Sequence, residues 1–280
     1  MVLLGSSGLI GSALVKIISG SRPLRTVRWS EDPRVSEALA KSLDPKMPTD
    51  VILACGVTDP KLAAETIRYS NTEFPQRLMS NCLRLPLVRF ISLGTVMENF
   101  PEACAANPYL KSKFDLGLWI QALAEKPEYL CRFRHLRLHT IYGGSRELVK
   151  PHMFLGQILG ALEKNLEFKM SSGDQLREYH HVDDIAEAIL GIADQDWNAN
   201  ESALVGVHSG NPVRLADLAN AIFSAFGKSD LLKVGRLVRP PGENLQQTFE
   251  RSARHVLPNA REPIAGVIQW LKEILDVRPR

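Results

Sequence analysis

The chain opens with Val2-Leu3-Leu4-Gly5-Ser6-Ser7-Gly8-Leu9-Ile10-Gly11, an apolar run followed at once by glycines spaced three apart. The run predicts a strand over Val2–Leu4, and apolar residues three and four apart predict a helix over Leu9–Ile18. A glycine turn at such a junction lets the backbone approach a pyrophosphate, whose charge the helix start favours. The alternative is a tight structural turn. We expect a dinucleotide site formed by Gly5, Ser7, Gly8, Leu9, Ile10 and Gly11.

The first half of the chain alternates short apolar runs with longer helical patterns. The run Val51–Ala54 is wholly apolar, as is typical of a strand buried on both faces. The alternation predicts an α/β fold, a doubly wound parallel sheet of the Rossmann-like type with helices on both faces. The expected strands are Arg25–Trp29, Val51–Cys55, Leu87–Ser92 and Arg134–His139, and the expected helices are Val35–Leu43, Ala63–Arg84 and Tyr109–Ala124.

After about residue 145 this rhythm changes, which predicts a smaller C-terminal substrate lobe beside the sheet. We expect the two parts to exchange segments. The first domain would comprise residues 1–145 and 182–206, and the lobe residues 146–181 and 207–280. The expected elements are a helix over Pro151–Lys164, a strand over Leu166–Met170, and helices over Ile185–Ala193 and Ile264–Leu275.

The composition narrows the class of protein. Of 280 residues, 45% are hydrophobic and 23% charged, which excludes a disordered chain. A net charge of +3 does not indicate a nucleic-acid partner. No run approaches the roughly 18 apolar residues of a membrane span, and no leader is visible, so we expect a cytoplasmic protein. The four cysteines are isolated from one another, which predicts free thiols and no metal site.

The end of the second expected strand bears on the choice of cofactor. Enzymes that prefer NAD usually carry an acidic residue here for the ribose 2′-hydroxyl. This chain has Arg28, Trp29 and Ser30, and Arg28 and Ser30 could both bind a 2′-phosphate. We therefore expect NADP, used as NADPH. NAD remains an alternative because Glu31 and Asp32 follow directly.

Tyr109 and Lys113 are four residues apart in a helix that Asn107 caps and Pro108 begins. They therefore share one helix face, about 6 Å apart along the axis. The nearby ammonium and the helix N-terminus are expected to lower the pKa of Tyr109. The phenol could then exchange a proton with a carbonyl or an alcohol. A solvated helix face is the alternative interpretation.

Several further segments resemble one family. Ala54-Cys55-Gly56 forms a small-residue turn after a strand, and Asn71 opens a helix. Residues 137–143 are similar to Arg-x-x-Asn-x-Tyr-Gly, and residues 173–186 to Gly-x-x-x-Arg-x-x-x-x-Val-x-Asp-x-Ala. With the glycine loop and the Tyr109–Lys113 pair, they resemble the extended short-chain dehydrogenase/reductase family of nucleotide-sugar epimerases and dehydratases. The resemblance implies a cofactor site that includes Cys55, Gly56, Asn71 and Lys113, and substrate contacts from Thr140, Arg177 and Arg239.

This family completes its site with a Ser or Thr after the fifth strand. Leu93 occupies the second place of the usual pair, so the hydroxyl must come from Ser92, which we favour, or from Thr95. The stretch from Glu31 to Asp50 also leaves little room for the family's third strand and its adenine-contacting aspartate.

The resemblance implies NADPH-dependent reduction of the C4 ketone of a nucleotide-diphospho-4-keto-6-deoxyhexose in deoxysugar biosynthesis. Tyr109 would donate the proton, Lys113 would hold the nicotinamide ribose, and Ser92 or Thr95 would polarise the carbonyl. The main alternative is an NAD-dependent nucleotide-sugar 4-epimerase. A dehydratase and a non-catalytic cofactor-sensing regulator are weaker alternatives. A homodimer is compatible with the resemblance.

Overall fold

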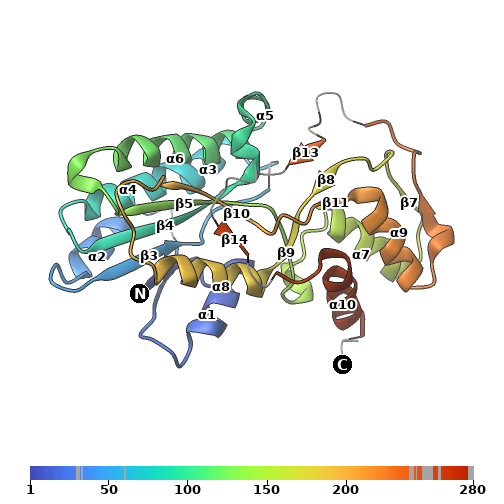
Figure 1. The fold of residues 1–280 in the computed structure, drawn as a ribbon, viewed down its shortest axis with the longest axis horizontal. Coiled ribbons are helices and arrows are strands. Elements are labelled where there is room, and N and C mark those ends of the chain that lie inside the picture. The colour runs from blue at the N-terminus through green and yellow to red at the C-terminus, as the bar shows by residue number, and fades with distance from the viewer. Residues whose placement is uncertain are drawn as a thin grey trace. The chain divides into compact units, whose positions relative to one another are not determined.

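The computed structural model describes residues 1–29, 32, 34–59, 61–239, 243, 245–247, 255–257 and 260–276. The chain forms two compact units, traced in Figure 1. The first comprises Met1–Leu138 and Ala186–Val207, and the second His139–Ile185 and His208–Arg280. Residues 139–145 and 182–185 thus belong to the second unit and Val207 to the first, whereas the boundaries expected from sequence place 139–145 and 182–185 in the first domain and Val207 in the lobe.

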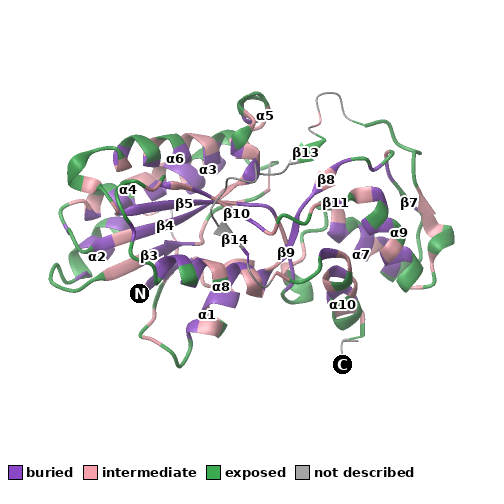
Figure 2. Ribbon diagram, in the orientation of Figure 1, coloured by how far each residue is buried: buried purple, intermediate pink, exposed green. Residues whose placement is uncertain are grey.

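A parallel sheet organises the first unit. Six of its strands follow the order β10-β5-β4-β3-β1-β2, and each of them pairs with its neighbours in this series in parallel. This arrangement confirms the predicted Rossmann-like α/β fold. The central strands are buried on both faces, as Figure 2 shows for β3, β4 and β5. The strands are β1 Val2–Leu4, β2 Arg25–Val27, β3 Thr49–Leu53, β4 Val88–Thr95, β5 Phe133–Leu138 and β10 Leu204–His208.

Helices cover both faces of this sheet. In Figure 1, α2, α3, α4 and α6 lie on one face and α1 and α8 on the other. The core between the sheet and the first group includes Phe74, Leu78, Phe90 and Phe133. The helical segments are α1 Leu9–Ile18, α2 Arg34–Ser42, α3 Ala64–Arg68, the π-helix η1 Tyr69–Glu73, α4 Phe74–Cys82, η2 Val96–Asn99, α5 Pro101–Ala106, α6 Pro108–Ala124, η3 Pro127–Tyr129 and α8 Val182–Ala193.

Two features of the first unit refine the sequence-based expectation. The helix expected over Ala63–Arg84 is three helical segments in succession, with a π-helical turn at Tyr69–Glu73 in the middle. Between α2 and β3 the described residues form no strand, and β2 follows β1 at the end of the sheet. In the region expected to be too short for the third strand of the family, the described residues therefore form α2 and no strand before β3.

The second unit is built from short strands and longer helices around its own core. That core includes Ile158, Leu218, Phe223 and Trp270. Strand β6 Thr140–Tyr142 pairs with β9 Tyr179–His181, β7 Phe168–Lys169 with β12 Leu232–Lys233, and β8 Leu176–Arg177 with both β11 Val213–Arg214 and β13 Gln246–Gln247. The remaining elements are β14 His255–Val256, η4 Arg146–Leu148, α7 Phe154–Lys164, α9 Leu215–Ala225, η5 Ser229–Leu231 and α10 Pro263–Asp276.

Three expected boundaries shift. The strand expected over Leu166–Met170 is limited to Phe168–Lys169, α7 begins at Phe154, and α8 begins at Val182, directly after β9. In the part of the chain that the structure describes, no helix combines the length and the apolar character needed to cross a membrane.

Candidate active site

The glycine loop joins β1 to α1 in the geometry that the sequence predicts. Gly5 has a φ of +87°, and a Cβ there would lie 2.5 Å from the carbonyl oxygen of Ala54. A Cβ on Gly11 would overlap the backbone of Gly5, so both positions require glycine. The amide of Gly8 closes the turn by donating to the Gly5 carbonyl at 3.1 Å. The loop therefore packs tightly against the end of β3.

The start of α1 has the chemistry that a pyrophosphate needs. No side chain caps this ten-residue helix, and its first turn contains no acidic residue. The first amides of a helix lack intrahelical partners, which leaves those of Leu9 and Ile10 as donors for an anion. Ser7 is exposed beside them. These residues fit the phosphates of a dinucleotide.

The end of β2 presents one cation and one aromatic ring. Arg28 is exposed, and no ion pair joins it to another described residue. Trp29 packs edge-on against Phe74 with 6.2 Å between ring centroids, and its buried Nε1 has no hydrogen-bond partner among the described residues. Ser30, which we predicted as a cofactor contact, lies outside the described residues, as does Glu31. The cation expected for a 2′-phosphate is thus accessible to solvent.

Asn71 ties the turn after β3 to α6. It is buried in the π-helical turn, where its Oδ1 accepts from the Val57 amide at 2.9 Å. Its Nδ2 donates to the Val57 carbonyl at 3.0 Å and to Ser112 Oγ at 3.1 Å. Gly56 has a φ of +139°, and a Cβ there would lie 2.5 Å from Asn71 Oδ1. Asn71 therefore fixes the turn that contains Cys55 and Gly56.

The predicted Tyr109–Lys113 pair lies in the first turns of α6. Asn107 caps this helix, because its side chain accepts from the amides of Tyr109 and Leu110 at 2.9 and 3.2 Å. Lys113 is buried, and its Nζ donates to the Leu93 carbonyl of β4 at 2.9 Å. The helix that bears the pair is thereby joined to the end of β4.

The expected pKa of Tyr109 is wrong in direction. Burial, together with the nearby carboxylate of Glu98, raises the pKa of Tyr109 to about 12. Burial lowers the pKa of Lys113, although Glu98 and Cys55 oppose that change. Burial, which spacing along a helix does not reveal, has the largest effect on the pKa of both groups. Tyr109 is therefore a neutral phenol at neutral pH and can act as a proton donor.

The two candidate hydroxyls differ in their surroundings. Ser92 is 1% exposed, and its Oγ is hydrogen bonded to His135 Nδ1 at 2.7 Å. Thr95 is half-buried, and its Oγ1 accepts from the Met97 amide at 3.3 Å. The two residues are three apart on a strand, so their side chains point to opposite faces. Thr95 can donate its proton outward, whereas the Ser92 hydroxyl is enclosed.

Glu98 and His135, which were not among the predicted site residues, meet beside these two hydroxyls. Both side chains are 0% exposed, and Glu98 Oε2 lies 3.0 Å from His135 Nε2. The same oxygen accepts from Arg137 Nε at 3.1 Å, and Oε1 accepts from the Thr95 amide at 2.7 Å. A local signal for Glu98 exists, because Thr95-Val96-Met97-Glu98 has the capping-box pattern. No local pattern indicates His135.

The predicted substrate residues all lie in the second unit. Thr140 is half-buried, and its amide donates to the Glu178 carbonyl at 3.2 Å. Arg177 is buried, and its Nη2 lies 3.5 Å from a carboxylate oxygen of Glu243. Arg239 is exposed, while residues 240–242 after it lie outside the described residues. The glycine loop, Asn71, Tyr109 and Lys113 belong to the first unit.

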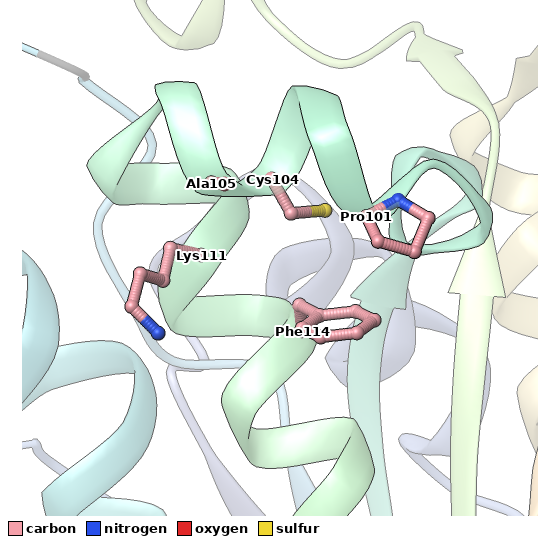
Figure 3. Close-up of a pocket in the computed structure, with 5 residues that line it drawn as sticks. All are labelled: Pro101, Cys104, Ala105, Lys111 and Phe114. Carbon is pink, nitrogen blue, oxygen red and sulfur yellow. The ribbon is translucent and has the colours of Figure 1, made fainter.

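Other parts of the described chain contain a pocket and a buried polar cluster, in which Glu178 lies 3.0 Å from His180 and 3.9 Å from His139. A pocket of about 170 Å³ is lined by Pro101, Cys104, Ala105, Lys111 and Phe114, as Figure 3 shows, and contains none of the predicted site residues. The four cysteines are free thiols. Among the described residues, no group of three or more His, Cys, Asp or Glu side chains could hold a metal ion.

Solved structures with this fold include several nucleotide-sugar enzymes. UDP-N-acetylglucosamine 4-epimerase from Bacillus cereus is 15% identical over 100% of this chain and 97% of that chain, with a TM-score of 0.76. The enzyme of that name from Methanobrevibacter ruminantium is 16% identical over 99% and 98%, with a TM-score of 0.77. A dTDP-glucose 4,6-dehydratase from Streptomyces venezuelae, solved with NAD bound, is 15% identical over 97% and 96%, with a TM-score of 0.75. At these identities the likeness shows a shared fold.

Sequence comparison assigns the family. No curated protein matches this chain. The model of the NAD dependent epimerase/dehydratase family matches residues 1–206, which include the glycine loop, Asn71, Tyr109 and Lys113. This match extends over more than half of the chain. The chain therefore belongs to the NAD-dependent epimerase/dehydratase family, which is a family of enzymes.

Proposed function

We propose that this protein is an NADPH-dependent reductase of a nucleotide-diphospho-4-keto-6-deoxyhexose. The observation that carries the proposal is the placement of Tyr109 and Lys113 on one face of α6, bonded to the end of β4 through Leu93. A phenol that stays protonated at neutral pH suits donation to a carbonyl oxygen.

Each residue of the proposed site has a separate role in the reduction. When bound, the reduced nicotinamide supplies a hydride. Tyr109 donates its proton to the carbonyl oxygen as negative charge develops there. Lys113 would hold the ribose hydroxyls of the nicotinamide nucleotide and would stabilise the phenolate left on Tyr109. The enclosure of Ser92 shifts our preference to Thr95 as the hydroxyl that polarises the carbonyl.

Cofactor and substrate would be held by the remaining predicted residues. The start of α1 and the turn at Cys55 and Gly56 would hold the dinucleotide, with Arg28 on the 2′-phosphate. Thr140 would contact the sugar. Arg239, which is exposed, and Arg177, once released from Glu243, would bind the diphosphate.

The test is NADPH oxidation with a panel of dTDP-, CDP-, UDP- and GDP-linked 4-ketosugars. We expect turnover with one nucleotide class, and a Tyr109→Phe variant should bind NADPH normally but turn over at least about 100-fold more slowly. Tyr129→Phe, in η3, is the matched control and should retain activity. If no ketosugar supports NADPH oxidation, or if Tyr109→Phe remains active, the proposal fails.

A nucleotide-sugar 4-epimerase is the second candidate, because solved structures with this fold include UDP-N-acetylglucosamine 4-epimerases. An epimerase reuses its cofactor. It would copurify with NAD and interconvert UDP-sugars without net NADPH consumption. Cofactor release from the purified protein, followed by an assay for NAD and NADP, separates the two candidates.

A further inference from the structure

Arg177 lies on a short strand of the second unit, in surroundings that bear on how it could bind a phosphate. Its strand, β8, is the middle one of three, between β11 and β13. The side chain is buried, and its Nη1 donates to the carbonyls of Leu176 at 2.8 Å and Leu245 at 3.3 Å. These two bonds fix the guanidinium, but neither brings a negative charge to it.

The carboxylate of Glu243 brings that charge. Its Oε1 lies 3.5 Å from Arg177 Nη2, and its Oε2 accepts from Gln175 Nε2 at 2.8 Å. Burial opposes the charged form of Arg177 and lowers its pKa, whereas Glu243 raises it. Glu243 therefore acts as the counter-ion that a buried cation needs.

This ion pair is loose. Charge-assisted bonds from a guanidinium to a carboxylate usually measure about 2.7–2.9 Å, and in the same unit Arg214 Nη2 lies 2.7 Å from Asp174. At 3.5 Å, Glu243 balances the charge of Arg177 without closing a full hydrogen bond. The Glu243 side chain is 27% exposed and that of Arg177 is 9% exposed, so solvent reaches the pair from the side of the carboxylate.

The backbone keeps Glu243 close to Arg177. Strand β13 begins three residues after Glu243 and pairs with β8 in parallel. The amide of Leu176 also donates to the carbonyl of Leu245 at 2.7 Å. A group tethered in this way acts at a high effective concentration. An anion from solution must therefore compete with Glu243 for the guanidinium.

Gln175 shows that the cluster is incomplete. Its side chain is 3% exposed, and its Oε1 has no hydrogen-bond partner among the described residues. A buried polar atom that stays unpaired lowers stability. A ligand that carries both an anion and hydroxyl groups, as a nucleoside diphosphate does, could pair with Arg177 and with this oxygen.

We propose that Glu243 holds Arg177 in an autoinhibitory contact, which the diphosphate of a nucleotide-linked sugar displaces when it binds. This inference rests on the proposed function, which assigns Arg177 to the diphosphate. A phosphate offers the guanidinium two oxygens, as a carboxylate does, and carries more negative charge. Arg177 thus keeps an anionic partner before and after the exchange. The contact weakens apparent binding, because only molecules in which Arg177 is released can bind the ligand.

The test follows the side-chain Nε signal of Arg177 by NMR in protein labelled with ¹⁵N-arginine, as inorganic pyrophosphate is added. Arg177→Gln, or Arg177→Lys if that variant does not fold, assigns the signal by its loss. Because the signal belongs to Arg177, the titration measures binding there and not at the start of α1. Glu243→Gln keeps the size of the side chain and removes its charge. It should tighten pyrophosphate binding at Arg177 about threefold to tenfold.

Two further variants separate the contact from the general effect of charge. Glu243→Asp keeps the charge but shortens the side chain by one methylene, so it should tighten binding as Glu243→Gln does. Glu167→Gln, which removes an exposed carboxylate of the same unit, is the matched control and should bind like the wild type.

Three results would overturn the autoinhibitory contact. The first is equal affinity of wild type and Glu243→Gln for pyrophosphate, including no response of the Arg177 signal in either. The others are wild-type affinity in Glu243→Asp, and tightening by Glu167→Gln that equals that of Glu243→Gln. The titration uses neither NADPH nor a ketosugar. Absence of turnover with every ketosugar would therefore overturn the proposed function separately.

Discussion

Arg28 is the residue on which the proposed preference for NADPH depends. A guanidinium that binds a 2′-phosphate makes charge-assisted hydrogen bonds of about 1.5–3 kcal/mol, so Arg28→Ala should weaken NADPH binding about tenfold or more. NADH lacks the phosphate, and its binding should change little. Fluorescence titration with both cofactors measures this. The matched control is Arg25→Ala, an exposed residue of β2 that bonds Ser42 Oγ instead. Equal losses for both cofactors would remove Arg28 from the phosphate site.

For single residues, local helix features could be predicted from the sequence, whereas properties that depend on tertiary packing could not. The cap, spacing and helix of Tyr109 and Lys113 follow from local chemistry, and the structure places the cap as expected. The pKa of Tyr109 does not follow, because burial and Glu98 depend on tertiary packing. His135 and Glu98 are 37 residues apart and meet only because β4 and β5 pair.

At the scale of elements, α6 approaches the sheet closely at Gly117. Alanine there would press on a carboxylate that His135 and Arg137 hold in place, so Gly117→Ala should lower the free energy of unfolding by about 1–3 kcal/mol. Gly160→Ala is the control, since Gly160 is also in a helix but a Cβ there meets nothing within 4 Å. Alanine at position 160 should raise the free energy of unfolding, by at most about 1 kcal/mol. Denaturant unfolding measures both changes, and equal effects would contradict the close packing at Gly117.

Elements differ in how well their sequences predict them. The sheet was predictable because buried strands such as β3 are apolar runs between helical patterns. The strand pairings of the second unit were not, although a strand was expected over Leu166–Met170, where β7 lies. Strand β7 has two residues, and its partner β12 lies more than 60 residues later, so its pairing leaves no local pattern. The π-helical turn at Asn71 does have a local signal, because Pro75 follows it and lacks the N–H that an α-helix would donate to the Asn71 carbonyl.

At the scale of the whole molecule, the two units should respond differently to acid. Burial lowers the pKa of His139, in the second unit, to about 4 from its ordinary 6.5. Between these values the unfolded chain binds a proton that the folded chain does not, so stability falls as the pH drops. Glu178 is also buried, but His180, His139 and the Ser209 amide hold its pKa at about 2, below the ordinary 4.5. The stability that ionised Glu178 contributes to the folded state is present above pH 4.5 and is lost as the pH falls toward 2. The stability contributed by Glu98, in the first unit, is likewise lost at acid pH, because its pKa is also lowered.

His139 should therefore dominate the loss of stability between pH 6.5 and 4.5 among these three groups. The full shift corresponds to a loss on the order of 3 kcal/mol by about pH 4. His139→Gln should flatten the slope of unfolding free energy against pH in this window, measured by denaturant titration from about pH 7 to about pH 4.5. His152→Gln, at an exposed position of the same unit, should retain the wild-type slope. If all three proteins share one slope, His139 does not cause the acid sensitivity, because only a group whose pKa changes on folding can contribute to it.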